Sequence, residues 1–272
     1  MFYIKESLKL TNKYIILATP LILFSLLSSL YILFSMNGTL LSMVFAFVLF
    51  FLMLTTFLSG WFFMVKKCVQ GYSENDSNSL IKEFPSGVGE YFLPIIGGTV
   101  NTIFLSVMIL TGAYFLGLNS IGELGIPAES FSKAMESTAA LKTFLLSLSQ
   151  EQLLKVNAWN FLLMGAMSFV YFILMFYSPV IFFKEKNPYK ALFMAIRDLF
   201  AVKFFKNICL YIILIVSYFI LSVFTTVFAN NVFMHFIFTL INFYYLVFVV
   251  VLVFNYYYKN YIRIGSNIDE TV

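Results

Sequence analysis

Long apolar stretches alternate with short polar ones along the chain. Six of the apolar stretches hold about 20 residues or more, which is the length of helix that crosses a hydrocarbon layer about 30 Å thick. Helices are expected because backbone in lipid must satisfy its own hydrogen bonds. We therefore predict an all-α integral membrane protein with six transmembrane helices in a single domain, residues 1–272. The predicted spans are residues 14–36, 39–65, 91–118, 158–183, 207–228 and 232–257.

The segment between the fourth and fifth spans, residues 187–206, is too charged to cross a membrane and too apolar for an ordinary loop. Asn187 suits a helix N-cap and Pro188 suits the first turn. The pattern predicts an interfacial amphipathic helix that anchors the chain at the membrane surface. Its apolar face carries Leu192, Ile196 and Leu199, with Phe193 and Phe200 beside it. Its candidate headgroup-binding residues are Lys190, Arg197, Lys203 and Lys206. Shorter amphipathic runs precede the first and third spans, at residues 2–10 and 79–84.

The loop after the third span, residues 119–157, also contains helical signals. Apolar residues recur at roughly helical spacing after the breaker at Pro127. Ser149 and Gln152 have the spacing of a capping box that opens a helix leading into the fourth span. We interpret the loop as an amphipathic helix over the outer face, with a binding lid as the alternative.

The distribution of Lys and Arg predicts the orientation in the membrane. With both termini inside, every one of the 17 basic residues lies on the cytoplasmic side except Lys133, Lys142 and Lys155, which share the long outer loop. Cytoplasmic loops of membrane proteins carry this excess. We therefore expect a multi-pass protein of the plasma or inner membrane with both termini cytoplasmic.

Composition agrees with this class. Hydrophobic residues make up 61% of the chain and charged residues only 11%, where a soluble domain would carry about 25% charged residues. The basic residues cluster beside apolar spans and form no continuous groove, so we expect no nucleic-acid partner. Cys68 and Cys209 have no Cys or His at metal-ligand spacing and are expected to be inert thiols.

Residues that would support catalysis are missing from the sequence pattern. No Asp, Glu, Lys or Arg lies in the interior of a predicted span, although such charges mark ion and substrate pathways. His235 has no second His or carboxylate one turn away, so a packing or interfacial role is expected. We predict no catalytic residues, no cofactor and no metal, and therefore no enzyme.

The third span is the most polar of the six. Pro94 and several Gly, Asn and Thr residues interrupt it. Small residues let helices approach closely, and Asn or Thr can bond across the interface. The alternative is a kinked helix that lines a cavity. The candidate cavity-lining residues are Gly97, Gly98, Asn101, Thr102, Asn160 and Asn242. Thr19-Pro20 and Ser178-Pro179 mark two further expected kinks.

The run PVIFFKEKNPYKAL, residues 179–192, is followed by a basic amphipathic stretch and another span. Over about residues 172–222, and in its six-span layout, the chain resembles the membrane domain attached to some bacterial glycerophosphodiester phosphodiesterases and related stand-alone membrane proteins. The match departs at Met194-Ala195, where the family often has a serine. We expect no phosphodiesterase barrel in this chain. The resemblance therefore implies architecture and no hydrolase activity.

Three functions remain open from the sequence. The first is transport or the handling of a lipid or another amphiphile, without catalysis. The second is a structural or assembly role, in which the polar positions only pack helices. The third is the permease subunit of an ATP-driven exporter. The expected partners are membrane lipids, together with either a membrane-protein partner or further copies of the chain.

Overall fold

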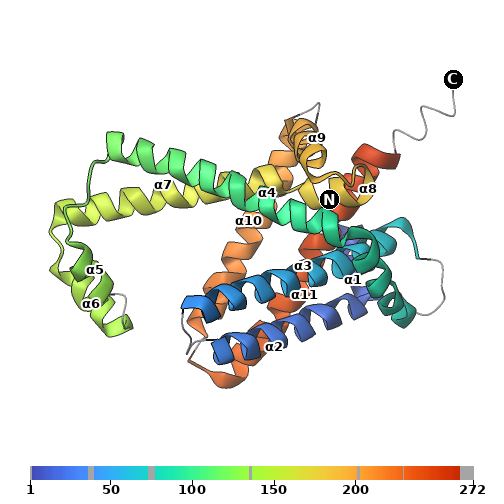
Figure 1. Cartoon of the computed structure of the whole chain (residues 1–272), viewed down its shortest axis with the longest axis horizontal. Coiled ribbons are helices and arrows are strands. Elements are labelled where there is room, and N and C mark those ends of the chain that lie inside the picture. Colours follow the sequence, from blue (N-terminus) through green and yellow to red (C-terminus); the bar gives the residue numbers. More distant parts are fainter. Residues whose placement is uncertain are drawn as a thin grey trace. The chain divides into compact units, whose positions relative to one another are not determined.

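The computed structural model describes residues 2–35, 40–72, 77–134, 137–200, 203–228 and 230–263. Figure 1 shows that these residues form helices, and no strand occurs among them. Six helical stretches in the described ranges are long and apolar enough to cross a membrane, which confirms the predicted all-α multi-pass membrane fold. The six stretches are Ile15–Ile32, Leu41–Gln70, Ser79–Ser120, Gln150–Phe183, Phe204–Val227 and Val232–Ile262.

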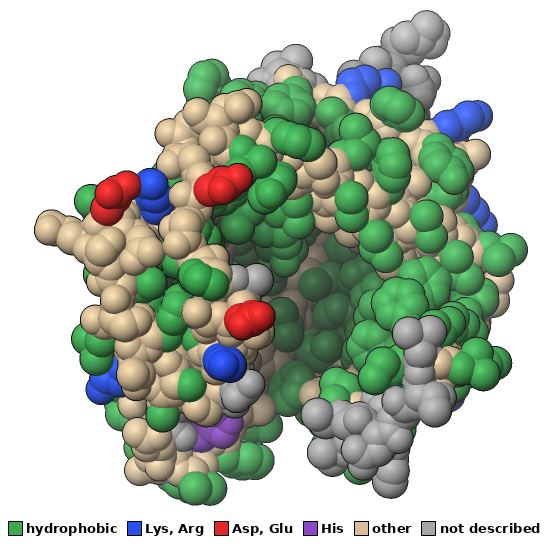
Figure 2. Space-filling view, turned by 60° about the vertical axis from the view of Figure 1, so that its left-hand side comes forward, with side chains coloured by type: hydrophobic (Ala, Val, Ile, Leu, Met, Phe, Trp, Pro, Cys, Tyr) green, Lys and Arg blue, Asp and Glu red, His purple; other side chains and the backbone are tan. Residues whose placement is uncertain are grey.

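The surface of these helices is apolar. Phe161, Phe205 and Val232 are each more than 80% exposed, and many other large hydrophobic side chains are more than half exposed. Figure 2 shows many hydrophobic side chains on the surface and only a few charged ones. Soluble proteins rarely expose apolar patches of more than a few hundred Å². An apolar surface of this kind requires lipid around the helices.

The chain forms two compact units. The first contains residues Met1–Asn101 and Ile173–Val272, and the second contains Thr102–Phe172. Two long helices contribute residues to both units: α4 (Glu83–Ser120) and α7 (Gln150–Leu174).

In the first unit, α11 (Val232–Tyr257) is the central element. Two neighbouring helices, α2 (Ala18–Ser35) and α3 (Leu40–Gln70), lie side by side and both contact α11. The N-terminal helix α1 (Phe2–Lys13) also packs on α11, so the predicted amphipathic run at residues 2–10 is helical and has a protein partner. The fifth span, α10 (Phe204–Val227), contacts α11 and the helix before it in the chain.

Aromatic side chains fill the core of this unit. Phe182 stacks on Tyr91 with ring centroids 4.2 Å apart, and Phe62 packs edge-on against Phe182. Trp61 Nε1 donates a hydrogen bond of 2.8 Å to the Leu17 carbonyl. Buried Trp normally finds such a partner for its N–H group. These contacts hold α3, α4 and the fourth span together near one end of the spans.

Two spans are broken where proline predicted kinks. The first span begins with a 3-10 turn, η1 (Ile15–Leu17), three residues before Pro20. The fourth span consists of α7, a turn, and the short helix α8 (Tyr177–Phe183), which contains Pro179. Proline has no N–H group and its ring crowds the carbonyl four residues earlier, which explains both breaks. In the third span, α4 contains Pro94 within one continuous helix.

The second unit contains the loop that the sequence predicts to be partly helical. It forms two short helices, α5 (Ala128–Ala134) and α6 (Thr138–Ser147). The predicted capping box is present: Gln152 N donates to Ser149 Oγ at 3.2 Å, and Ser149 N donates to Gln152 Oε1 at 3.0 Å. The helix that this box opens, α7, continues directly into the fourth span as predicted.

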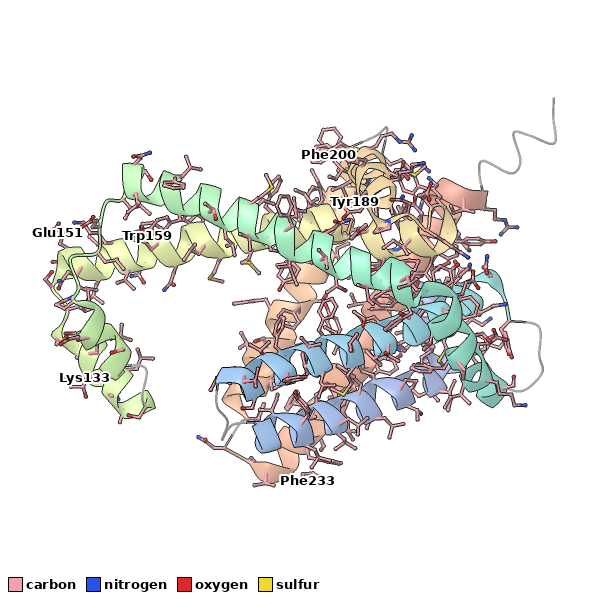
Figure 3. All side chains as sticks on the ribbon, in the orientation of Figure 1. Lys133, Glu151, Trp159, Tyr189, Phe200 and Phe233 are labelled. Atoms are coloured by element: carbon pink, nitrogen blue, oxygen red, sulfur yellow. The ribbon has the colours of Figure 1, made fainter. Side chains whose placement is uncertain are left out.

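Trp159 joins α4 to α7 within the second unit (Figure 3). A Cβ atom added at Gly117 would lie 2.3 Å from Trp159 Cη2, so only glycine leaves room for the indole. Trp159 Nε1 also donates to the Gly122 carbonyl at 3.1 Å. Further along the same pair of helices, Gly112 and Gly165 line a groove of about 610 Å³.

Candidate functional site

Gly97, Gly98 and Asn101, in the third span, lie against residues 177–188 of the chain. A Cβ at Gly97 would lie 2.5 Å from Pro188 Cγ, and one at Gly98 would lie 3.1 Å from Ile181 Cδ1. Asn101 is 6% exposed, and its Nδ2 donates to Tyr177 Oη at 3.0 Å. These contacts favour the interpretation in which small and amide residues let helices approach closely.

The other candidate cavity residues have separate surroundings. Asn242 donates through Nδ2 to Thr225 Oγ1 at 3.2 Å and to the Phe238 carbonyl at 2.9 Å, so it links α11 to α10. Thr102 and Asn160 belong to the second unit, where Asn160 is exposed. The structure therefore brings Gly97, Gly98 and Asn101 together, and gives Asn242 a different set of partners.

The predicted interfacial helix is α9 (Pro188–Phe200). Asn187 caps it: its Oδ1 accepts from Tyr189 N at 3.0 Å and from Lys190 N at 3.2 Å. The helix packs against α8 through a buried face that includes Ala191 and Ala195. Small side chains at these positions allow a close approach, so α9 is held by protein along one side.

The exposed side of α9 differs from the predicted one. Leu199 is fully buried, whereas Tyr189, Phe193 and Phe200 are 65%, 75% and 49% exposed. Figure 3 labels Tyr189 and Phe200 on this helix. The apolar face predicted from Leu192, Ile196 and Leu199 turns partly toward the protein, since Leu199 is buried together with Ala191 and Ala195. The aromatic residues form the exposed apolar stripe instead.

The basic residues lie next to this aromatic stripe. At 100° per residue, Lys190 and Arg197 project from α9 within about 20° of each other and adjacent to Phe193. Lys190 is exposed, and the Arg197 side chain is 67% exposed. Exposed aromatic rings beside basic side chains are typical of a helix at a membrane–water interface.

An ion cluster that the sequence did not reveal lies behind α9. Asp198 Oδ2 accepts from Lys184 Nζ at 2.7 Å and from Tyr257 Oη at 2.6 Å. Arg197 Nη2 lies 3.2 Å from Asp198 Oδ1. Burial alone would raise the pKa of Asp198, but the hydrogen bonds from Lys184 and Tyr257 outweigh burial and lower that pKa. Asp198 therefore stays ionised and ties α9 to α8 and α11.

A second group of hydrogen bonds continues from this cluster. Asn207, at the start of α10, donates through Nδ2 to the Leu199 carbonyl at 2.8 Å and accepts from Tyr256 Oη at 2.9 Å. Lys203 Nζ donates to both the carbonyl and Oδ1 of Asn260 at 3.0 Å. Burial, followed by the nearby Lys206 charge, lowers the pKa of Lys203. Lys203 is thus engaged by protein, whereas Lys206 is exposed.

The acceptor for Lys203 lies in a π-helical turn, η3 (Tyr258–Ile262), which extends α11. Turns of this kind are rare and insert an extra residue into the helical ladder. Near the same end of α11, Lys259 pairs with Glu6 of α1, and Asn255 Nδ2 donates to Ser7 Oγ at 3.1 Å. The end of α11 therefore connects α1, α8, α9 and α10.

Nothing in the described residues forms a metal site. No group of three or more His, Cys, Asp or Glu side chains is placed to hold a metal ion within the described ranges. Cys68 is fully buried, and His235 is exposed near the start of α11. Comparison of the chain with protein-family models, curated proteins and solved structures finds no match in any of the three.

The sequence pattern did not predict that Asp198, Lys184, Asn207 and Tyr257 form a connected group. One signal was available: Asp198 is the only acidic residue in the segment 187–206, and it lies on the side of the helix opposite to Phe193. An acidic residue on the side of a helix that faces protein needs a cationic partner. Its partners come from residues 14 positions before it and 59 positions after it, which no local pattern reveals.

Proposed function

We propose that the chain is a lipid- or amphiphile-handling protein of the cell membrane that performs no chemistry of its own. The observation that carries this proposal is that α9 has three sides with different surroundings. One side is fixed to α8, one exposes Tyr189, Phe193 and Phe200, and one exposes Lys190 and Arg197. Such a helix offers an apolar surface to acyl chains and a cationic surface to anionic headgroups at the same depth.

The proposal includes an orientation. Both termini lie in the cytoplasm, because this arrangement places nearly all Lys and Arg residues on the side where membrane proteins carry them. In that orientation α9 faces the cytoplasmic leaflet, which contains the anionic lipids that attract basic segments. The chain is then a plasma- or inner-membrane protein, and its proposed resemblance to membrane domains of bacterial phosphodiesterases concerns architecture alone.

Lipid movement in liposomes tests the proposed function. The purified chain, reconstituted into vesicles that contain anionic phospholipid, should accelerate exchange of labelled lipid between leaflets relative to protein-free vesicles. Replacing Lys190, Arg197 and Lys206 together by Gln should slow exchange of anionic lipid more than that of zwitterionic lipid. Each basic residue near the surface contributes about 1 kcal/mol toward anionic lipid.

A matched control uses the basic residues of the loop 119–157, which is predicted to lie on the outer side of the membrane. Lys133, Lys142 and Lys155 changed together to Gln remove the same charge but leave α9 intact, and exchange should stay as in the wild type. An exchange rate equal to that of protein-free vesicles for the wild-type chain would refute the proposed function.

A structural or assembly role is the second candidate, and one observation favours it. Gly97, Gly98 and Asn101 all serve contacts between helices. Under this alternative the chain would be inactive in the exchange assay and would be recovered from membranes bound to a protein partner or to further copies of itself.

A further inference from the structure

An apolar groove lies in the first unit between α2, α3 and the start of α4. Four elements line it: α2 contributes Leu23 and Leu27, α3 contributes Met53 and Phe57, and η2 (Ser77–Lys82) and α4 contribute Ile81 and Phe84. The groove has a volume of about 460 Å³, within the range of about 300–1,000 Å³ that is usual for ligand sites. We refer to it as the α2–α3 groove.

The walls of this groove are fixed by close packing. A Cβ at Gly60 would lie 2.6 Å from two ring carbons of Phe84, so only glycine in α3 admits this ring. Phe24 stacks on Phe57 with centroids 4.3 Å apart, and Phe57 stacks in turn on Trp61. Leu23 and Leu27 nevertheless remain 54% and 55% exposed along the edge of the groove. The groove is therefore preformed and open along one side.

The groove runs from a polar boundary into the apolar depth of the spans. One end lies at η2, which contacts η1 at the start of the first span. The other end lies at Leu27, seven residues beyond Pro20, or about 10 Å along α2 at about 1.5 Å per residue. Lys82 directly follows the lining residue Ile81, is exposed, and forms no ion pair with any residue in the described ranges. The neighbouring Lys67, by contrast, pairs with Glu83.

We propose that the α2–α3 groove holds one acyl chain of an anionic phospholipid, with the phosphate of its headgroup beside Lys82. This inference rests on the proposed lipid-handling function and names its ligand class. The charge lies at the boundary end and the apolar surface runs inward, which is the distribution of charge and hydrocarbon in such a lipid. An anionic phospholipid supplies both a negative charge for the exposed Lys82 and hydrocarbon for the apolar lining, which distinguishes it from a wholly apolar helix of a second copy.

Native mass spectrometry of the detergent-purified chain tests the proposal, with phosphatidylglycerol and phosphatidylcholine as probes. The wild-type chain should retain one phosphatidylglycerol as a discrete mass shift. Leu23→Trp fills the groove and should lose this species. Leu26→Trp is the matched control, because Leu26 lies on the same helix, is 58% exposed, and does not line the groove; it should retain the lipid. Lys82→Gln should weaken the preference for phosphatidylglycerol about fivefold, the factor that corresponds to about 1 kcal/mol per basic residue near the surface.

A crosslinking experiment locates the acyl chain independently of retention. Phosphatidylglycerol with a photoreactive acyl chain, incorporated with the chain into nanodiscs, should label peptides that contain Met53 and Phe57 in the wild type, and not in Leu23→Trp. Equal lipid retention by Leu23→Trp and Leu26→Trp would overturn the proposal, as would a dimer mass in place of the lipid adduct. If the wild-type chain retains no lipid but exchanges lipid between leaflets, the groove proposal is wrong and the proposed function is still supported. If it retains the lipid but does not exchange lipid, the proposed function is wrong and the groove proposal is still supported.

Discussion

Asp198 is the residue whose replacement tests the packing of α9 most directly. In Asp198→Asn the side chain keeps its size, and its remaining oxygen can still accept from Tyr257 Oη. The substitution removes the negative charge that faces Lys184 Nζ at 2.7 Å. Lys184 then keeps a partly buried positive charge without its anionic partner, and its ammonium lies near the rings of Tyr257 and Tyr261.

The magnitude follows from how deeply the two charges lie. The side chains of Asp198 and Lys184 are 6% and 21% exposed. Removing one partner of a buried ion pair costs about 3–5 kcal/mol. Lys184 can regain some water, and its cation–π contacts persist, so we expect the lower end, about 3 kcal/mol. Arg197→Gln is the control, because a guanidinium that is 67% exposed contributes about 0–1 kcal/mol.

Thermal unfolding of the purified chain in detergent measures the difference. At roughly 2–4 °C per kcal/mol for a chain near this length, Asp198→Asn should lower the midpoint by about 6–12 °C. Arg197→Gln should lower it by less than about 4 °C. The double variant Lys184→Gln with Asp198→Asn should recover part of the loss, since neither charge is then left alone. Equal midpoints for the two single variants would refute the assignment of Asp198 as the charge that fixes α9.

The pH dependence has a definite sign. The pKa of Asp198 is lower in the folded protein than in the unfolded chain. Its contribution to stability is therefore complete above the unfolded pKa and is lost as pH falls through the folded pKa. The midpoint difference between wild type and Asp198→Asn should stay constant from about pH 8 to about pH 6, well above the ordinary range of Asp. A difference that shrinks within that window would assign the effect to another titrating group.

Two further predictions concern topology and helix packing. Single cysteines placed at Asn230 and Ser130, in a background without the native thiols, should react with an impermeant thiol reagent in intact cells, while one at Ser77 should not; labelling at Ser77 alone would reverse the proposed orientation. Gly97→Ala should destabilise the chain by about 1–3 kcal/mol because the new methyl group meets Pro188. Gly112→Ala, where nothing lies within 4 Å, should stabilise by up to about 1 kcal/mol through helix propensity; denaturation midpoints that move in the same direction would contradict this contrast.

Periodicity and length were sufficient to predict the six spans. A span must be apolar over about 20 residues whatever surrounds it, so this signal is local. The proline breaks at η1 and between α7 and α8 were also local, because the missing N–H group acts on the residue's own helix. Pro94 shows the limit of this rule. It lies inside α4, and the helix continues on both sides.

The orientation of α9 could not be predicted from its own residues. Two faces of this helix are apolar enough to be buried, and one of them contains Ala191 and Ala195. The alanine side is buried, and the charged group on it, Asp198, is neutralised by residues from distant parts of the chain. A hydrophobicity pattern ranks the larger side chains first and therefore assigned Leu199 and its neighbours to the lipid. Only the tertiary structure identifies which apolar side is covered.

The attachment of α10 shows how polar residues substitute for a hydrophobic driving force in this fold. Within lipid, apolar contacts between helices gain little, because lipid tails are as apolar as the side chains that they cover. Outside its first turns, most of α10 is exposed. Side-chain hydrogen bonds join it to α11, among them those between Asn207 and Tyr256, Ser217 and Tyr245, and Thr225 and Asn242. Side-chain bonds of this kind average about 0.6 kcal/mol each in membranes. The bonds of Ser217 and Thr225 therefore set how α10 is aligned along α11 more than they add stability. The position of α10 is then set mainly at its first turn, where Asn207 joins the network that surrounds Asp198.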